Sequence, residues 1–296
     1  MKPALRKPTL FDVSSLVLVG AIWGGSFLFI SLALQTFGPV TITALRVLLA
    51  SAVLLLFAFF LNQRFPTAFS DWRKLAVVGL LNSALPFFLI NWGQQTISSA
   101  ESALLMATGT FCALMLSHFT TVDERINWAR GLGVFVGFIG VAVLVVADLF
   151  AAGLGGIKGQ LAVMLAGASY AASSVLARRV SYLPPVSASA TAMITATCYM
   201  IPLAFIFEEP LQATLTIQAV LSILFLGVIA TGFAFSIRFI IIRNNGAVFM
   251  AQVGYLVPLF GVIWSWLFLT DVISIQTWIA LALIVIGIGI TRRGVR

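Results

Sequence analysis

The chain has 296 residues, of which 61% are hydrophobic and only 9% are charged, and its mean hydropathy is +1.10. Soluble globular domains carry roughly 25% charged residues, so this composition excludes an ordinary soluble protein and indicates a membrane protein. A membrane-spanning helix takes about 20 apolar residues, and ten such helices would occupy most of the chain. No room remains for a soluble nucleotide-binding domain, and the sequence has no Gly-x-x-x-x-Gly-Lys-Ser/Thr phosphate-binding motif.

The sequence is poor in residues that bind metals or form disulfides. It has one histidine, His118, and two cysteines, Cys112 and Cys198, which lie in apolar runs. A zinc or iron site needs three or four clustered ligands, so we expect no metal and no cofactor. The net charge of +8 does not indicate nucleic-acid binding, because the basic residues fall in short loops and not on one folded face.

Ten apolar segments, punctuated by Gly, Pro and charged residues, predict ten transmembrane helices. The first segment is too long for the apolar core of a cleaved signal peptide. The expected helices span residues 13–34, 40–61, 75–92, 99–121, 128–147, 157–177, 186–207, 217–240, 247–269 and 275–290.

The basic residues predict the orientation of these helices. Cytoplasmic loops are enriched in Lys and Arg, and placing the N-terminus inside puts fifteen of the seventeen basic residues on the cytoplasmic side. Both termini are therefore expected in the cytoplasm. The two exceptions are Lys158, in an outer loop, and Arg46, within the second helix. The fifteen residues are Lys2, Arg6, Lys7, Arg64, Arg73, Lys74, Arg125, Arg130, Arg178, Arg179, Arg238, Arg243, Arg292, Arg293 and Arg296.

Weak self-similarity divides the chain into two halves, residues 1–150 and 151–296. A shift of about 147 residues aligns segment 100–103 with segment 247–250 and Gly140 with Gly287. Each half has five predicted helices, and because five is odd, the second half enters the membrane in the opposite orientation. Inverted repeats of this kind build alternating-access transporters, whose substrate site lies near the midplane. The sequence thus predicts an all-α membrane protein of ten transmembrane helices, arranged as two inverted five-helix repeats.

Several short motifs are spread along the chain: Trp23-Gly24 followed by Phe27, Arg46, Ser98-Ser99-Ala100, Asp123-Glu124-Arg125-Ile126, and the run from Gly131-Leu132-Gly133 to Gly140. Together they resemble the EamA-type branch of the drug/metabolite transporter superfamily. The resemblance implies a basket of helices one to four and six to nine around a central cavity, with helices five and ten at the periphery. It also implies export of small metabolites, often amino acids.

Polar and aromatic side chains inside the predicted helices supply a candidate substrate site. Polar groups in a membrane usually face the bundle interior, and aromatic walls with a few hydroxyl and amide groups suit a small amphipathic ligand. Pro86 and Pro258 each free a backbone carbonyl near mid-span, although a simple packing kink is the alternative. For the remaining candidates, the alternative to a substrate site is that the side chain packs between helices or faces lipid. The candidate substrate-binding residues are Trp23, Phe27, Asn82, Pro86, Tyr170, Ser174, Phe235, Arg238, Gln252 and Tyr255.

Three further ionisable residues lie within predicted helices. Arg46 has a functional interpretation as a clamp for a substrate carboxylate, but the favoured interpretation is an arginine that extends to the outer interface or bonds helix-end carbonyls. Glu101 and His118 lie near opposite ends of the fourth helix, where a role in ion coupling remains an alternative. No Asp or Glu occupies the centre of a predicted helix, which favours facilitated export or exchange over strong proton coupling.

Glycines predict close helix packing at the periphery. Gly133 and Gly137 form a small-xxx-small pair in the fifth helix, and Gly287 lies in the tenth. These residues seat the peripheral helices against the bundle or support a dimer contact, so the expected state is a monomer or a homodimer.

We therefore expect a multi-pass carrier of the bacterial inner membrane, and not an enzyme. It would export small metabolites, foremost neutral or aromatic amino acids, by alternating access, with the substrate and the lipid bilayer as its partners. An intramembrane enzyme and a channel are the alternatives. A serine enzyme would need a histidine base, for which only His118 near a membrane face is available, and a channel would favour a continuous polar helix face, which none of the ten helices has.

Overall fold

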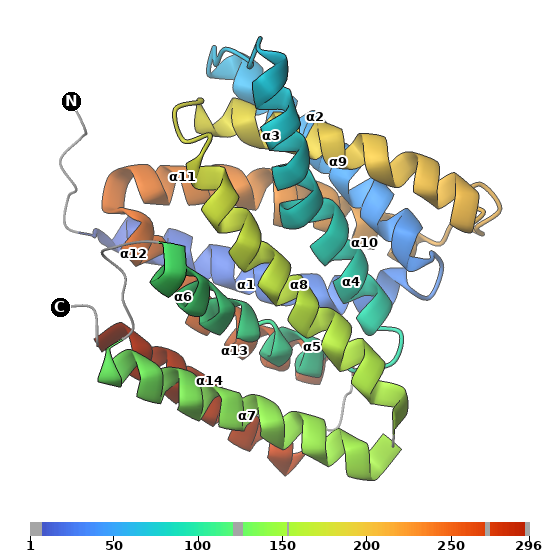
Figure 1. Ribbon diagram of the computed structural model, residues 1–296. Helices are drawn as coiled ribbons and strands as arrows, with labels where there is room; N and C mark the ends of the chain where they lie inside the picture. The colour runs from blue at the N-terminus through green and yellow to red at the C-terminus, as the bar shows by residue number, and fades with distance from the viewer. Residues whose placement is uncertain (1–7, 121–126, 153, 270–272, 294–296) are drawn as a thin grey trace.

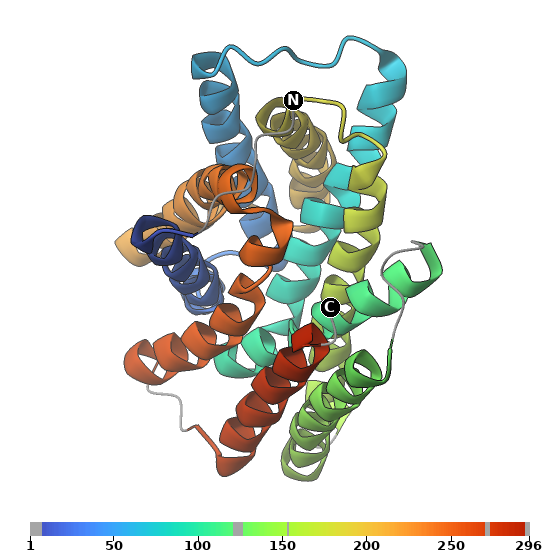
Figure 2. The same cartoon turned by 90° about the vertical axis from the view of Figure 1, so that its left-hand side faces the viewer.

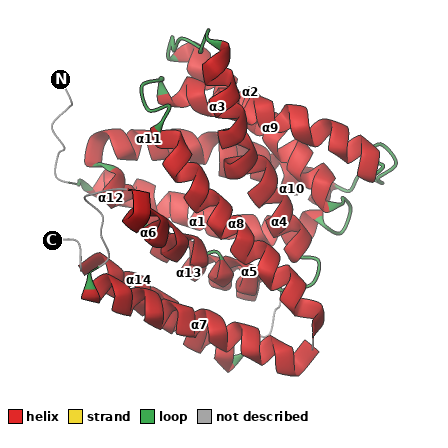
Figure 3. Cartoon of the chain, in the orientation of Figure 1, coloured by secondary structure: helices red, strands yellow, loops and turns green. Residues whose placement is uncertain are grey.

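The computed structural model describes residues 8–120, 127–152, 154–269 and 273–293, and every regular element in these ranges is a helix (Figure 3). The motif at 123–126 and the basic residues Lys2, Arg6, Lys7, Arg125 and Arg296 lie outside the described ranges. The elements are α1 (Leu10–Ala33), α2 (Pro39–Phe60), α3 (Phe69–Gly79), η1 (Leu80–Ala84), α4 (Leu85–Gly93), α5 (Ser99–Leu105), α6 (Thr108–Thr120), α7 (Trp128–Ala152), α8 (Leu154–Arg178), α9 (Pro185–Phe207), α10 (Ile217–Leu224), η2 (Phe225–Phe233), α11 (Ala234–Asn245), α12 (Ala247–Met250), α13 (Val253–Phe268) and α14 (Ile275–Arg293).

The described helices include eight that are long and apolar enough to cross a membrane, and two shorter apolar helices, Val253–Phe268 and Ile275–Thr291. These ten segments coincide with the ten segments expected from the sequence. The protein is therefore an all-helical, multi-span membrane protein. In Figure 1, α1 begins and α14 ends on the same side of the molecule, as an even number of crossings requires.

Four of the expected helices are not regular throughout. A π-helical turn, η1, precedes Pro86, and a longer one, η2, separates α10 from α11. The helix breaks between α5 and α6 and again between α12 and α13. Proline has no backbone N–H and cannot continue the hydrogen-bond ladder, which accounts for the irregular turn beside Pro86. Irregular turns within helices are frequent at functional sites, and here they surround the interior of the bundle.

Several helices pack side by side in long pairs whose two members lie far apart in the sequence (Figures 1 and 2). α7 and α14 form a pair along one edge of the molecule, and α2 pairs with α9 at the opposite side. α1 packs against α13, and α8 packs against both α4 and α6. α7 and α14 thus take the peripheral positions that the family resemblance implies for helices five and ten, while the other helices surround a central space.

Glycines hold the α7–α14 pair at close range. A Cβ atom on Gly287 would lie 2.6 Å from the Gly133 carbonyl oxygen and 2.6 Å from the Gly137 amide nitrogen. Such distances are shorter than van der Waals contact, so the two backbones approach in a way that only glycine permits. In this structure Gly133 and Gly287 pack the two peripheral helices against each other. The dimer contact that the sequence leaves open stays a prediction.

Candidate substrate cavity

A cavity of about 570 Å³ lies at the centre of the bundle, lined by residues of α1, α2, α3, η1, α4, α6, α8, α9, η2, α11, α12 and α13. Its volume is in the range of small-molecule binding sites. Both halves of the chain contribute residues to its wall.

Trp23 forms one wall of the cavity and is fixed by two contacts. Its indole Nε1 donates a hydrogen bond of 2.9 Å to the carbonyl of Ala230, and its ring packs edge to face with Phe235 at a centroid distance of 6.0 Å. Ala230 belongs to the π-helical turn η2 and also lines the cavity. The indole therefore ties α1 to the irregular part of the eighth span.

Arg46 also lines the cavity, and the favoured sequence interpretation of this residue is wrong. Its side chain is only 6% exposed, and Nε donates a hydrogen bond of 3.0 Å to Thr231 Oγ1. Its guanidinium carbon lies 3.7 Å from the centre of the Phe87 ring. The polar hydroxyl of Thr231 and the aromatic face of Phe87 hold the arginine inside the bundle, so it does not extend to the outer interface. A charged residue within an apolar span was the signal that could have identified it.

Helix α8 contributes a short row of polar side chains to the cavity: Tyr170, Ser173 and Ser174. Ser174 Oγ donates to the Ala171 carbonyl at 2.7 Å, so its hydrogen is used within its own helix. Ser173 is only 1% exposed, and its hydroxyl has no partner among the described residues. Ser173 was not among the sequence candidates, because nothing in the helical spacing distinguishes it from Ser174.

Seven of the ten sequence candidates line the central cavity: Trp23, Phe27, Asn82, Tyr170, Ser174, Phe235 and Arg238. They come from α1, η1, α8 and α11, so the structure brings together residues that are far apart in the chain. Whether they bind substrate remains a prediction. Arg238 stands two helical turns beyond Thr231, on the side where α11 ends.

The other three candidates do not line this cavity. Pro86 is buried at the start of α4, and its neighbour Phe87 faces the cavity instead. Gln252 is exposed, and Tyr255 Oη donates to the Ile288 carbonyl of α14 at 2.9 Å. The residues of this span that line the cavity include Met250, Gly254 and Pro258, which follow one another at four-residue spacing. Gln252 and Tyr255 lie on a different face of the span.

Buried amides join the helices near the cavity-lining residue Phe27. Gln94 Nε2 donates to the Phe27 carbonyl at 3.0 Å, and Asn91 Nδ2 donates to Thr43 Oγ1 at 2.9 Å. These amides connect α1, α2 and the end of the third span. A second hollow of about 300 Å³ shares Asn82 and Arg238 with the cavity and extends to the loop before α9.

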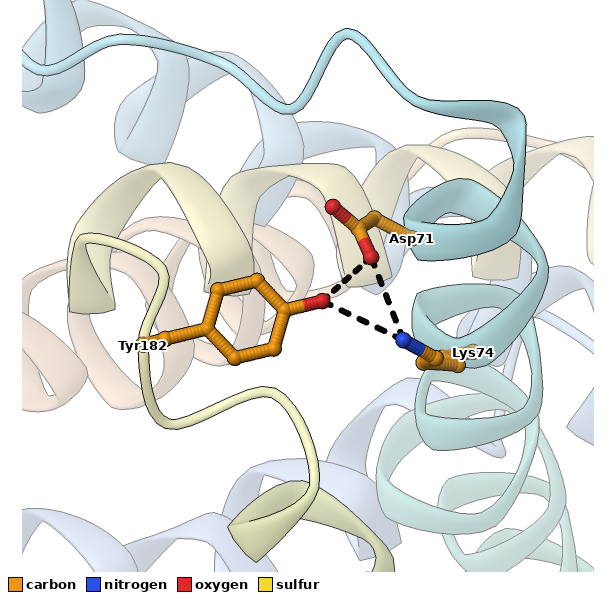
Figure 4. A network of polar contacts seen from close by, with 3 residues as sticks. All are labelled: Asp71, Lys74 and Tyr182. Carbon is orange, nitrogen blue, oxygen red and sulfur yellow. Dashed lines mark hydrogen bonds and ion pairs between the residues drawn. The ribbon is translucent and has the colours of Figure 1, made fainter.

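A polar cluster lies beside this second hollow and joins the two halves of the chain (Figure 4). Lys74 Nζ donates to Asp71 Oδ1 at 3.3 Å and to Tyr182 Oη at 3.2 Å, while Tyr182 Oη donates to Asp71 Oδ1. Asp71 and Lys74 belong to α3, and Tyr182 belongs to the loop between α8 and α9. The cluster therefore ties the third span to the start of α9 on the side where the hollow lies.

A helical membrane protein with a central cavity that both halves of the chain line has the architecture of a solute transporter. The sequence profile of the EamA-like transporter family matches residues 11–146 and again residues 157–293, so the chain belongs to this family. Its members and the named relatives below are transporters, and this chain is accordingly a membrane transporter and not an enzyme.

Several curated proteins are similar to this chain over nearly its whole length. Uncharacterized transporter YoaV of Bacillus subtilis is 23% identical over 92% of this chain and 94% of its own. An uncharacterized transporter of Archaeoglobus fulgidus is 26% identical over 93% of this chain and 95% of its own length. Uncharacterized inner membrane transporter YedA of Escherichia coli K12 is 22% identical over 92% of this chain and 88% of its own length. A solved crystal structure superposes with a TM-score of 0.68 and 23% identity over 95% of this chain and 98% of its own, which shows a shared fold.

Proposed function

We propose that this protein is a carrier that exports small metabolites by alternating access through the central cavity. The observation that carries the proposal is the buried Arg46 in the wall of a cavity that both halves of the chain line. A charged side chain inside a membrane protein is costly, so such residues usually mark a substrate or ion pathway.

We also propose that residues 1–150 and 151–296 form two inverted repeats. The double match of the family profile supports this division. Glycine packing also supports it. Gly20 and Gly167 are 147 positions apart, and each packs closely against another helix: a Cβ on Gly20 would collide with Leu256, and a Cβ on Gly167 would lie 2.8 Å from the Gly109 amide nitrogen. The residues that they meet, Gly109 and Leu256, are also 147 positions apart. The two π-helical turns, Leu80–Ala84 and Phe225–Phe233, occupy corresponding places in the two halves.

The proposed topology has ten crossings with both termini in the cytoplasm of a bacterium and the protein in the inner membrane. The distribution of Lys and Arg supports this orientation, and YedA is described as an inner membrane protein. The second hollow extends toward the ends of α8 and α11, where Arg178 and Arg243 lie. In this orientation the cavity faces the cytoplasm, as it must when an exporter loads its substrate.

Neutral and aromatic amino acids are the first substrate class that we propose. Trp23, Phe27 and Phe235 would hold an apolar side chain, and Arg46 would bind the carboxylate. We propose facilitated export or exchange, because no Asp, Glu or His of the described residues lines the cavity. Proton relays usually need such a group within the span.

Counterflow in proteoliposomes tests the proposed function. Vesicles containing the purified protein are loaded with a metabolite panel, and uptake of trace labelled solute is measured with and without a proton gradient. We expect saturable uptake that is accelerated by internal substrate and persists when the gradient is collapsed. Uptake that rises linearly with concentration and ignores internal solute would indicate a channel, and a strict need for the gradient would refute facilitated exchange.

A further inference from the structure

The charge of the cavity wall restricts what the cavity can bind. Arg46 and Arg238 both line it, and no carboxylate of the described residues does. Two described carboxylates that lie nearer the helix ends are engaged elsewhere, since Asp12 caps the start of α1 and Glu208 accepts hydrogen bonds from the start of α2. The cavity wall therefore holds two arginine charges that no described acidic side chain neutralises.

Arg46 has the geometry of an anion site. Within the described part of the chain its one hydrogen bond is made by Nε, which leaves the four N–H groups of the two terminal nitrogens for a ligand. The Phe87 ring covers one face of the guanidinium at 3.7 Å, so an anion reaches its edge. Two parallel N–H donors on that edge match the two oxygens of a carboxylate.

The wall around Arg46 suits the apolar body of a ligand, but it suits poorly a ligand that also carries an ammonium group. Trp23, Phe27 and Phe235 present aromatic surface to the cavity. Within the described residues, an ammonium group would find neutral oxygens there, such as Tyr170 Oη and Ser173 Oγ, but no carboxylate. Charges in a desolvated site interact strongly, so the arginines repel an ammonium that is not held by an acid.

We propose that the cavity selects organic anions over zwitterions and cations of the same shape. A carboxylate binds Arg46, and an apolar or aromatic body lies against Trp23 and Phe235. Arg238, which stands about 10 Å farther along the helix than Thr231, attracts the anion toward the cavity from the mouth. This proposal rests on the proposed function, because it concerns the substrate of the same cavity. It refines the substrate class proposed above: an aromatic amino acid still binds through its carboxylate, but less tightly than the matching acid that lacks an ammonium group.

A series of three ligands with one phenyl body tests the selection without any substitution. Binding of 3-phenylpropanoate, phenylalanine and phenethylamine to the purified full-length protein is measured by calorimetry at neutral pH. We expect 3-phenylpropanoate to bind about tenfold more tightly than phenylalanine, and phenethylamine to bind weakest of the three. Equal or tighter binding of phenylalanine or of phenethylamine would overturn the proposal.

Two substitutions then locate the anion site. Arg46→Gln is expected to weaken 3-phenylpropanoate binding about a hundredfold, because it removes a charge-assisted bidentate contact. Arg243→Gln is the matched control, since Arg243 is an exposed residue of the same helix as Arg238 and does not line the cavity. Thermal unfolding of each purified variant checks that it is folded. A folded Arg46→Gln protein that binds the anion like the wild type would refute the assignment.

The counterflow assay separates this proposal from the proposed function. If labelled amino acids exchange with saturation but 3-phenylpropanoate neither binds nor competes, the protein is a carrier and the anion selection is wrong. If no solute in the panel exchanges although 3-phenylpropanoate binds through Arg46, the anion site stands and alternating-access transport is wrong.

Discussion

Glu208 and Gln63 cap the two helices of the α2–α9 pair at opposite ends. The Glu208 carboxylate, at the end of α9, accepts hydrogen bonds from the backbone N–H groups of Val40 at 3.0 Å and Thr41 at 2.8 Å, where α2 begins. Gln63 Oε1, just after α2, accepts from Val186 at 3.1 Å and Ser187 at 3.0 Å, where α9 begins. Each helix thus satisfies the free N–H groups of the other. This reciprocity fixes the register of two helices that belong to different halves of the chain.

Removing either cap should destabilise the protein. Glu208→Ala and Gln63→Ala are each expected to lower the free energy of unfolding by about 1 kcal/mol, the usual value of a helix N-cap. The caps lie about 30 Å apart along the helices, so the double variant should show the sum of the two effects. Denaturation of the detergent-solubilised protein measures both. Glu209→Gln is the control, because Glu209 is an exposed neighbour, and an equal loss in that variant would refute the capping role.

Close packing of α7 and α14 predicts unequal effects of two glycine substitutions in one helix. Gly287→Ala places a methyl group against the backbone of Gly133 and should cost about 1–3 kcal/mol of stability, as overpacking does. A Cβ on Gly289 meets nothing within 4 Å, so Gly289→Ala should change stability by less than about 0.5 kcal/mol. Thermal unfolding of the two purified variants makes the comparison. Similar melting temperatures for both would show that the α7–α14 pair packs differently.

Substitutions of Trp23 and Gln252, which the sequence pattern assigned to one site, are expected to affect substrate affinity differently. Trp23→Ala removes aromatic surface from the cavity and should weaken the binding of a phenyl-containing substrate about tenfold. Gln252→Ala should leave the affinity unchanged, because Gln252 is exposed and does not line the cavity. Binding is measured by calorimetry on variants of matched purity. A loss of affinity in Gln252→Ala alone would place the substrate site elsewhere on α13.

The cluster of Tyr182, Asp71 and Lys74 predicts a shift between conformations. Tyr182→Phe removes the hydroxyl that joins the α8–α9 loop to α3, so the observed state should become less populated. Reactivity of a cysteine at Ala177, which lines the cavity near its mouth, reports this population. We expect about a twofold slower reaction with an impermeant reagent in the double variant than in Ala177→Cys alone. The difference should shrink in high salt, which screens exposed charges, and a rate that Tyr182→Phe leaves unchanged would show that the cluster does not select this state.

Inverted repeats predict that equivalent loops lie on opposite faces of the membrane. Gln35 and Ser181 are exposed residues 146 positions apart, in the loops that precede α2 and α9. A single cysteine at each position, in a background without Cys112 and Cys198, is labelled with an impermeant reagent in sealed vesicles. We expect one position to react from outside and the other only after the vesicles are opened. Labelling of both from the same face would refute the inversion.

The membrane-spanning helices could be predicted from the sequence, because each one is determined by a contiguous apolar run and by the residues that interrupt it. Ten segments of suitable length, bounded by glycine, proline and charge, coincide with the helices of the structure to within a few residues at most ends, although the third span begins at Phe69 and not at residue 75. The membrane imposes this correspondence, since a span must be long, apolar and hydrogen-bonded within itself. Family membership could be predicted as well, because its motifs are short and contiguous.

What faces the cavity was decided by the tertiary structure. Seven of the candidates line the cavity, and Pro86, Gln252 and Tyr255 do not. Gln252 and Tyr255 share a helix face, but another face of the same span, with Gly254 and Pro258, lines the cavity. Arg46 was assigned to the interface, yet Thr231 and Phe87, which are 185 and 41 positions away, hold it in the centre. Helical periodicity tells which residues share a face of one helix. Which face turns inward depends on partners that only folding brings together.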